Sequence, residues 1–430
     1  MRRALVLFAT VLAFGAAGCG EDEKKRSGSV SGDVSFMVFG DPDEIQGFRD
    51  VIKAYEAEQP DVNVKLIEAS DRDDLLARLS TSFAGGTPPD LFLLNYRYYG
   101  QYAAKDVLEP IEERVNDSDV FQEEDFYEQA LEAFRFGGEL TCLPQNISSL
   151  VVYYNEDLFE QSGVPPPKAD WTWNDMVAAA KKLTKDENGD GKAEVYGLGV
   201  ESVIIRLAPF VWSAGGELVD DDENPTHFTL ETPEAQNAMA DFFELHLVDE
   251  VIPSEEEVES EDDETRFLNG RLAMLLESRR VTPTMRAIDK FDWDVAALPQ
   301  HEQESSILHA DGYCMTEASE NKDAAWSFME YALGPEGAPI VAKSGRTVPS
   351  LKEVAESDVF LDPNAKPANS QVWLDAIPSI RHVPAISTWP EIEDAVEPML
   401  EEAMYKGESM QGLAREIRQV SDPLFARAEN

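Results

Sequence analysis

Strand-like and helix-like segments alternate along the first hundred residues of the chain. The apolar run VSFMVFG (34–40) ends at a Gly-Asp-Pro turn, and the segment at 44–60 follows with apolar residues at helical spacing. The same order recurs in VNVKLIEA (62–69), RDDLLARLSTSFAGG (72–86) and PDLFLLN (89–95). This alternation predicts an α/β fold with largely parallel sheets, in which ligands bind beyond the carboxyl ends of the strands. The loops at 40–44 and 95–102 are therefore candidate binding loops.

The rest of the chain repeats this pattern with different segment lengths. The expected strands are LVVYYN (150–155), VYGLGV (195–200), WDVAALP (293–299) and GYCMTEA (312–318). The expected helices lie at 173–185, 233–248, 324–334 and 388–407, and the segment 266–278 predicts a helix that stops at Gly270 before a strand. Thr172 or Asn174 is expected to cap the helix at 173–185. A chain of 430 residues is long enough for two domains.

The charge of the chain is strongly negative and limits its partners. There are 84 acidic and 36 basic residues, which give a formal net charge of −48. Such a chain repels nucleic acid and anionic membrane surfaces, so we expect no nucleic-acid partner. Most of this charge is expected to be a solvated surface, as in the acidic run at 249–265.

Motifs of common enzyme classes are absent from the sequence. The five histidines show no metal-binding spacing, and no Gly-x-Ser-x-Gly elbow or phosphate-binding Gly-rich loop occurs. These absences argue against a hydrolase or a zinc enzyme, and we expect a protein without catalytic residues. Carboxylates are numerous enough that a secreted glycosidase stays an alternative.

The N-terminal residues have the zones of an export signal. Arg2 and Arg3 precede an apolar stretch at 4–14, which is followed by the small-residue segment GAAGC ending on Cys19. AAGC resembles a bacterial lipobox, so we expect a lipoprotein signal peptide at 1–18, a lipidated Cys19 and a flexible tether at 19–32. The paired arginines also raise a twin-arginine signal as an alternative, but nothing else of that motif surrounds them. The lipid would be the only membrane anchor.

Aromatic residues occur repeatedly at the ends of expected elements. A flat aromatic face there can stack on the apolar side of a sugar ring, while polar neighbours bind the hydroxyl groups. The residues in question are Tyr96, Tyr98, Tyr99, Trp212, Tyr313 and Trp389. We expect Trp171 and Trp173, in contrast, to anchor the helix at 173–185 by packing.

The acidic turn DENGDGKAEVYG (186–197) resembles half of a calcium-binding loop. Oxygen-bearing side chains stand at its first, third and fifth positions and Gly191 at the sixth, but Gly197 occupies the position of the bidentate Glu. A structural Ca²⁺ is therefore possible rather than required, and a metal-free Asx turn is the alternative. Its candidate ligands are Asp186, Asn188, Asp190, the Lys192 carbonyl and Glu194.

A series of stretches, in order from about residue 34 to the C-terminus, resembles one family. They are the segment 40–64, FAGGTPPDLFLLN, LPQNISSLVVYYNEDLFEQSGV, DWTWNDMVAAAKKLT, WSAGGELVD, FLNGRLAMLL and AAWSFMEYALGPEG. The family is that of the extracellular solute-binding proteins of ABC importers, which includes carbohydrate receptors such as maltose-binding protein. The resemblance implies a receptor that captures a sugar or oligosaccharide outside the cytoplasm and delivers it to the permease subunits. A receptor of the same fold for a polyol phosphate or a compatible solute is the alternative.

The resemblance also implies two α/β lobes joined by hinge strands, with the ligand cleft between them and a monomeric receptor. The first lobe would comprise 33–145 and 272–312, and the second 146–271 and 313–430. The chain would cross between lobes near 144–148, 272–276 and 311–315. Cys142 and Cys314 would then both lie beside hinge strands, either as a disulfide or as two buried thiols.

Candidate ligand-binding residues follow from the aromatic pattern and from the resemblance together. Asp41 resembles the family's hydroxyl-binding acid, Trp389 a stacking aromatic, and NYRYYG (95–100) its first-lobe binding loop. Arginines including Arg97 can hydrogen-bond hydroxyls or pair with an acidic sugar, unless they are ordinary salt-bridged arginines. The candidate set is Asp41, Asn95, Tyr98, Tyr99, Arg206, Trp212, Arg279, Arg280, Tyr313, Arg346 and Trp389.

Overall fold

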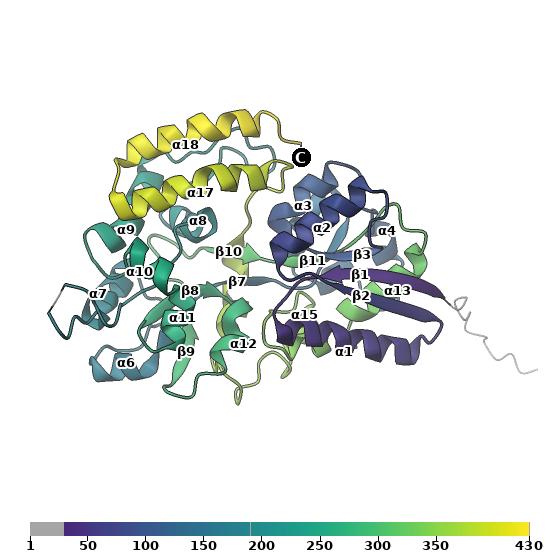
Figure 1. Cartoon of the computed structure of the whole chain (residues 1–430), viewed down its shortest axis with the longest axis horizontal. Coiled ribbons are helices and arrows are strands. Elements are labelled where there is room, and N and C mark those ends of the chain that lie inside the picture. The colour runs from purple at the N-terminus through teal and green to yellow at the C-terminus, as the bar shows by residue number, and fades with distance from the viewer. Residues whose placement is uncertain (1–29, 190, 430) are drawn as a thin grey trace, which may run out of the picture.

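The protein consists of two lobes, each built around a β-sheet (Figure 1). This computed structural model describes residues 30–189 and 191–429. The expected signal peptide at 1–18, the lipidation site Cys19 and nearly all of the expected tether lie outside these residues. Within the described part of the chain, no helix combines the length and the apolar character that a membrane crossing requires.

The first lobe contains a five-stranded sheet in the order β2-β1-β3-β11-β6. The three N-terminal strands run parallel, whereas β11 is antiparallel to both β3 and β6. Their apolar side chains are buried between covering helices, as the alternation in the sequence predicts. The strands are β1 (Gly32–Val38), β2 (Val62–Glu68), β3 (Leu91–Asn95), β6 (Cys142–Pro144) and β11 (Asp311–Met315).

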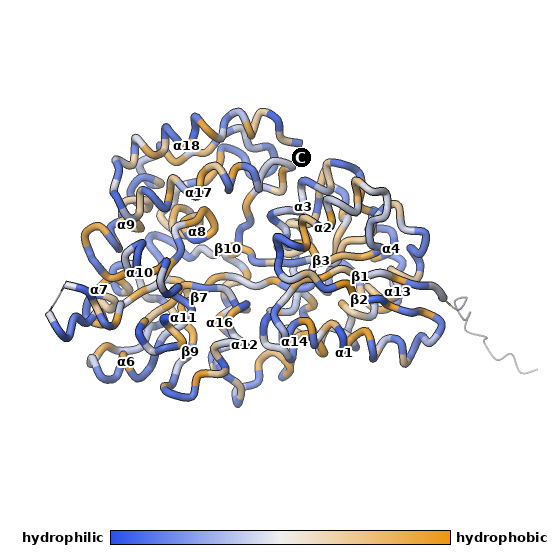
Figure 2. The backbone as a smooth tube through the Cα atoms, in the orientation of Figure 1, coloured by the Kyte–Doolittle hydropathy of each residue, from blue (hydrophilic) through white to orange (hydrophobic). Residues whose placement is uncertain are grey.

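The first three helices of this lobe, α1, α2 and α3, begin shortly after the strands β1, β2 and β3 end. Asp41 caps α1 by accepting hydrogen bonds from the amides of Asp43 and Glu44, and Pro42 occupies the first helical position. Figure 2 shows polar and apolar residues alternating along α1, as expected for a helix with one buried face. The elements are α1 (Pro42–Glu58), α2 (Arg72–Ala84), α3 (Tyr96–Ala103), α4 (Glu112–Asn116), η1 (Glu123–Asp125), α5 (Glu128–Glu132), α13 (Lys322–Leu333), α14 (Ala338–Ala342) and α15 (Lys352–Ala355), with a hairpin of β4 (Arg135–Phe136) and β5 (Glu139–Leu140).

The second lobe is built around β7, whose residues are all buried. On its two sides β7 pairs with β8, β9 and β10, and every one of these pairs is antiparallel. Among the named strands, β12 alone adds a parallel partner, to β10. The strand expected at 195–200 is present only as isolated bridges, which include parallel ones from Tyr196 to Leu272 and from Gly199 to Leu275. The expectation of largely parallel sheets is therefore wrong for this lobe, because the neighbours of β7 come from the distant segment 274–309 rather than from the next strand of a βαβ unit, and each of them runs opposite to β7. The strands are β7 (Ser148–Asn155), β8 (Met274–Ser278), β9 (Trp293–Ala296), β10 (Ser306–His309) and β12 (Ile380–Arg381).

The helices of the second lobe surround this sheet, with α17 and α18 forming a pair over α9 (Figure 1). Thr172 caps α7 and completes a capping box with Asp175, which confirms one of the two predicted caps. Trp171 and Trp173 are both buried, as expected. The elements are α6 (Glu156–Gln161), α7 (Trp173–Leu183), α8 (Ile204–Ser213), α9 (Pro233–Leu247), α10 (Glu255–Ser260), α11 (Asp263–Leu268), η2 (Arg279–Val281), α12 (Thr282–Met285), α16 (Gln371–Ala376), η3 (Ile377–Ser379), α17 (Trp389–Lys406) and α18 (Met410–Phe425).

Strand pairing corrects the expected division of the chain between the lobes. β8, β9 and β10 all belong to the second sheet, so the segment 272–312 was assigned to the wrong lobe except at its end. Conversely β11 pairs with β3 and α13 packs on β1, so residues 311–342 belong to the first lobe. The crossing expected near 272–276 does not exist, because β8 pairs with β7 along its whole length.

The connections between the lobes lie side by side. Gln145 and Ile147, between β6 and β7, hydrogen-bond through their amides to the carbonyls of Asp311 and Val348. The side chain of Asn146 donates to the carbonyl of His309 at 2.8 Å and accepts from the amide of Asp311 at 2.9 Å. Asn146 thus joins the β6–β7 connection to the β10–β11 connection at the point where both leave the first lobe.

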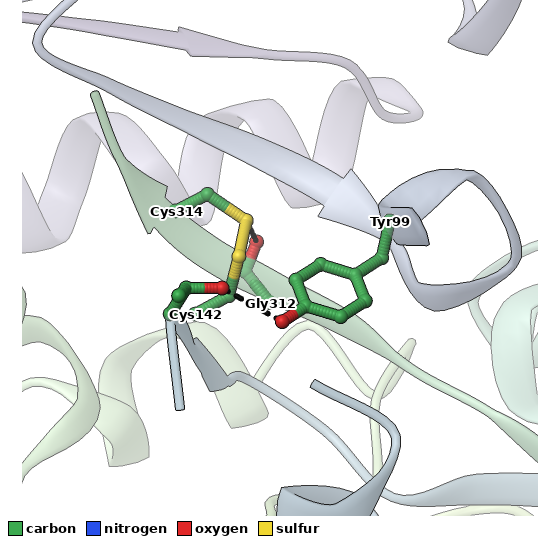
Figure 3. Close-up of a disulfide and its surroundings, with 5 residues drawn as sticks. Tyr99, Cys142, Gly312 and Cys314 are labelled. Carbon is green, nitrogen blue, oxygen red and sulfur yellow. Dashed lines mark hydrogen bonds between the residues drawn. A yellow bond between two sulfur atoms is a disulfide. The ribbon is translucent and has the colours of Figure 1, made fainter. Parts of the chain in front are cut away.

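Cys142 and Cys314 form a disulfide between β6 and β11 (Figure 3). The two residues are direct partners in the antiparallel ladder, and both are fully buried. The disulfide is therefore the alternative that the structure adopts, rather than two buried thiols. It fixes an edge strand of the first sheet to its neighbour beside the hinge.

Candidate ligand cleft between the lobes

A cavity of about 590 Å³ lies between the two sheets. Its first-lobe wall is formed by residues that follow β1 and β3, and its second-lobe wall by the segment 201–206, η2 and α17. Asn146 of the β6–β7 connection and Ser148 at the start of β7 line it between these walls. Both lobes therefore contribute to one cavity, at the carboxyl ends of strands β1 and β3 as predicted from the sequence.

Asn95 shapes the first-lobe wall at the end of β3. As the cap of α3 its side-chain oxygen accepts from the amide of Arg97, and its side-chain nitrogen donates to the carbonyl of Ala310 and to Asp311 Oδ1, at 3.1 Å from the latter. Burial raises the pKa of Asp311, although the guanidinium of Arg346 acts in the opposite direction. The end of β3 is thereby attached to the β10–β11 connection.

Arg97 and Glu393 form an ion pair across the cleft. Arg97 Nη1 lies 2.9 Å from Glu393 Oε2, and the two side chains are 12% and 5% exposed. The indole nitrogen of Trp389 also donates to Glu393, at 2.9 Å. α3 belongs to the first lobe and α17 packs on α8 and α9 of the second, so this pair joins the lobes.

Glu277 lies at the centre of the charged groups of the second-lobe wall. Arg206 and Arg280 each contact its Oε2 at 2.8 Å. Burial of Glu277 opposes its ionisation, but the charges of the two guanidinium groups outweigh burial and lower its pKa to about 2. Arg206 also pairs with Glu201, and Arg280 with Glu264. Both arginines line the cleft and both are charge-compensated.

Arg346 is held by two carboxylates of the first lobe. It contacts Asp41 at 2.8 Å and also forms an ion pair with Glu44. Burial raises the pKa of Glu44 to about 7 in spite of the guanidinium beside it. Asp41 thus has two roles: it caps α1, and it forms an ion pair with Arg346, which lines the cavity.

Tyr98 is the tyrosine that the structure places in the cleft. The guanidinium of Arg72 lies 5.1 Å from its ring centroid and that of Arg97 at 5.8 Å. Phe39, after β1, lines the same cavity. Five of the predicted ligand-binding residues line this cavity: Asn95, Tyr98, Arg206, Arg280 and Arg346. A sixth, Asp41, contacts Arg346 from behind.

The other predicted aromatic residues are in the hydrophobic core, so their assignment to a binding site is wrong. Tyr99 donates to or accepts from Thr141 and packs against Phe134, and Tyr313 packs against Phe36. Side chains at the end of an element can point either into the cleft or beneath it, and the periodicity of the sequence does not distinguish the two directions. The buried aromatic residues are Tyr96, Tyr99, Trp212, Tyr313 and Trp389.

Arg279 is also a core residue rather than a cleft residue. Its guanidinium lies 4.4 Å from the ring centroid of Phe360 and 4.5 Å from that of Trp373, and Nη1 donates to Ser370. Burial lowers the pKa of Arg279 to about 9. Its neighbour Arg280 points into the cleft instead, so only one of the two consecutive arginines is available to a ligand.

Several lining residues were missed by the sequence analysis. They include His309, Asp311, Glu201, Glu393 and Glu397. Burial and the nearby charge of Arg206 keep the pKa of His309 well below its usual range, so its ring is neutral at pH 7. Asp311 follows the connection beside β3 and could have been found from that position, whereas the carboxylates of α17 approach the cleft only through long-range packing.

The acidic turn is closed by hydrogen bonds from its own backbone. The carboxylate of Asp186 accepts from the amides of Gly189 and Gly191, and that of Glu194 from the amide of Glu187 and the side chain of Asn188. The predicted ligand Asp190 lies outside the described residues. Among the residues that are described, no group of three acidic, histidine or cysteine side chains converges on a metal position. The hydrogen bonds that Asp186 accepts from Gly189 and Gly191 fit an Asx-type turn.

Two α/β lobes with a polar cavity at their connections define a two-lobed ligand-binding protein. The family model of bacterial extracellular solute-binding proteins matches residues 41–339. The chain belongs to this family.

Individual relatives cover most of the chain. A binding protein of Brucella abortus is 26% identical over 355 residues, which are 81% of this chain and 82% of the relative. The maltotriose-binding protein of Pyrococcus abyssi is 26% identical over 332 residues, 75% of this chain and 68% of the relative. Among solved structures, an ABC substrate-binding protein of Listeria monocytogenes in complex with cycloalternan has a TM-score of 0.82 and 26% identity, and the match covers 91% of this chain and 98% of that one.

These comparisons confirm the predicted family and the two-lobed α/β fold. Proteins of this family are extracytoplasmic and supply substrates to ABC transporters. Their role as solute-binding proteins agrees with the expectation of a protein without catalytic residues.

Proposed function

We propose that this protein captures a sugar or an oligosaccharide in the cleft between its lobes and delivers it to the permease of an ABC importer. Support comes from relatives whose names state maltotriose binding and galactooligosaccharide binding, and from the similar Listeria protein bound to cycloalternan. The walls of the cleft come from both lobes, so a bound ligand stabilises the closed arrangement by contacting both. The closed form is then the one offered to the permease.

The observation that carries this proposal is the pairing of the cleft arginines. Four of the five arginines that line the cavity form close ion pairs with carboxylates of the protein: Arg97, Arg206, Arg280 and Arg346. The fifth, Arg72, lies 3.9 Å from Asp73. A phosphate would have to displace these carboxylates or bind beside them. A neutral hydroxyl group has no such conflict, because it can donate to the carboxylate and accept from the guanidinium of the same pair. This arrangement favours a polyhydroxylated neutral ligand over a polyol phosphate.

The anchoring and the assembly state are further parts of the proposal. The lipobox-like segment at Cys19 supports a lipoprotein that is tethered to the membrane on the extracytoplasmic side. A monomer fits a receptor whose ligand site is formed within one chain. A structural Ca²⁺ at 186–194 remains a prediction, and its candidate ligands within the described residues are Asp186, Asn188, the Lys192 carbonyl and Glu194.

A ligand screen tests the proposed function directly. Purified protein is heated with mono- and oligosaccharides, uronic acids, polyols, polyol phosphates and betaines, and hits are measured by titration calorimetry. We expect a neutral saccharide to raise the melting temperature by mass action. Stabilisation only by phosphates or betaines would overturn the sugar assignment. Hydrolysis of any bound glycoside would support the glycosidase alternative instead.

A further inference from the structure

A second cavity, of about 660 Å³, lies in the second lobe and shares part of its wall with the ligand cleft. It is bounded by β8, the start of α11 and the α17 helix. The residues that line both cavities include Glu201, Arg280, Asp394 and Glu397. A ligand in the cleft can therefore extend into this space. We call it the acidic annex, because its lining includes the carboxylates of Glu201, Asp262, Asp263, Glu264, Glu277, Asp394, Glu397 and Glu401.

The positive charge in the lining does not balance these carboxylates. Arg280 is the only arginine or lysine among the lining residues, and it pairs with Glu277 and Glu264. Among the described residues, Asp263, Glu397 and Glu401 have no ion pair at all. The annex therefore has an excess of negative charge that the rest of the cleft does not share.

One carboxylate of the annex has a covered oxygen without a partner. Oδ1 of Asp263 is shielded from solvent, and no hydrogen-bond donor within the described chain reaches it. Burial raises the pKa of Asp263 to about 7 although Arg266 acts in the opposite direction, and burial together with Glu393 raises that of Glu397 to about 7. A buried acceptor without a donor is costly, and a cationic ligand group would supply the missing donor.

The kind of cation is limited by the arrangement of the carboxylates. In the described part of the chain, no three acidic, histidine or cysteine side chains converge as metal ligands do, so the carboxylates of the annex lack the arrangement that a metal ion requires. The ring of Tyr405 forms part of the wall beside Asp263. Spread carboxylates and an aromatic ring suit an organic ammonium group, which takes up several hydrogen bonds and a ring face.

We propose that the acidic annex binds the ammonium group of an amino-sugar residue, while the neutral part of the same saccharide occupies the cleft. The inference rests on the proposed function and specifies its substrate class as saccharides that carry a free amine. The amine donates to Asp263 from one wall and to the carboxylates of α17 from the other.

Paired ligands test this inference. The affinity of the protein is measured for pairs of saccharides, in which one member is neutral and the other has one hydroxyl replaced by an amine. The neutral members are α- and β-linked gluco- and galacto-saccharides of one to three units. We expect the amino form to bind at least about tenfold more tightly than its neutral parent, and the difference to shrink at high salt. N-acetylation, which removes the charge, should abolish the preference.

Single-residue variants test whether the preference for the amino form arises in the annex. Asp263→Asn and Glu401→Gln act on two different walls and should each reduce the preference for the amino form, while binding of the neutral parent is unchanged. Glu402→Gln changes the adjacent residue of α17 outside the annex and should leave the preference intact. If neutral saccharides bind and amino forms bind no better, or if neither annex variant alters the preference, the inference is overturned and the receptor assignment stands. If no saccharide of either series binds, the proposed function falls as well.

Discussion

Arg97 of the first lobe and Glu393 of the second lie 2.9 Å apart across the ligand cleft, and Trp389 supports the carboxylate. A charge pair at this position couples the two lobes in the arrangement that the structure shows. Its removal affects both the stability of the protein and the balance between open and closed forms.

Removal of the Glu393 charge should destabilise the protein. Glu393→Gln leaves the buried guanidinium of Arg97 without its counter-ion, which we expect to cost roughly 3 kcal/mol in the free energy of unfolding by urea. Glu391→Gln is the matched control, because Glu391 lies on the same helix but pairs with Arg427 at the surface, where both side chains are 56% exposed. Equal stability of the two variants would contradict a coupling role for the Arg97–Glu393 pair.

Two consecutive tyrosines should separate binding from stability. Tyr98→Ala removes a ring from the cleft, and we expect it to weaken saccharide binding about tenfold with little change in stability. Tyr99→Phe removes the hydroxyl that contacts Thr141 in the core, and should cost about 1 kcal/mol of stability with no change in affinity. Calorimetry and urea titration measure the two quantities. The reverse assignment of effects would refute the placement of these residues.

The disulfide should contribute strongly to stability. Cys142 and Cys314 are 172 residues apart in the sequence, and closing so long a loop stabilises the folded state by up to about 5 kcal/mol in the chain-entropy account. Addition of a reductant should therefore lower the urea midpoint of the wild-type protein. The double variant Cys142→Ala, Cys314→Ala serves as the control, since the reductant should not affect it. A count of accessible thiols in the denatured, unreduced protein checks that the bond forms.

Glu44 should make stability depend on pH in a specific direction. Its pKa is raised from 4.5 to about 7 by burial, so between these values the folded state binds more protons than the unfolded state. Stability contributed by Glu44 is therefore fully present below pH 4.5 and falls as the pH rises to 7, by up to roughly 3 kcal/mol. Glu44→Gln should reduce this decline. An unchanged slope of unfolding free energy between pH 5 and 7 would show that Glu44 is ionised throughout.

The acidic turn offers a test of calcium binding. If Ca²⁺ occupies 186–194, millimolar Ca²⁺ should raise the melting temperature and a chelator should lower it. Asp186→Asn should remove the response. Exposed Asp170 lies outside the turn, and Asp170→Asn should preserve it. No response of the wild-type protein would establish the turn as an Asx turn without metal.

The first lobe was the most predictable part of the fold. The strand expected at 34–40 and the helix at 44–60 correspond to β1 (Gly32–Val38) and α1 (Pro42–Glu58), because apolar periodicity, Asp41 and Pro42 are all local signals. The insertion of β11 between β3 and β6 is not a local property. It depends on contacts between residues more than 160 positions apart, such as Cys142 and Cys314.

The ligand site was harder to predict than the fold. Tyr98 and Tyr99 are neighbours with the same chemistry, yet one lines the cleft and the other fills the core, since successive residues of α3 point in different directions. Arg279 and Arg280 separate in the same way at η2. The carboxylates Glu393 and Glu397 reach the cleft because α17 packs against α3, and no spacing within α17 reveals that contact.

The side chain of Asn146 hydrogen-bonds to His309 and Asp311, so two of the polypeptide connections between the lobes are fastened to each other at their midpoint. Behind them the Cys142–Cys314 bond holds the strands from which both connections emerge. The two connections therefore form one hinge segment rather than two independent ones. We expect the lobes to open and close by rotation about this joined pair of connections, because sideways shearing would have to break the hydrogen bonds of Asn146 and would misalign the two halves of the cleft.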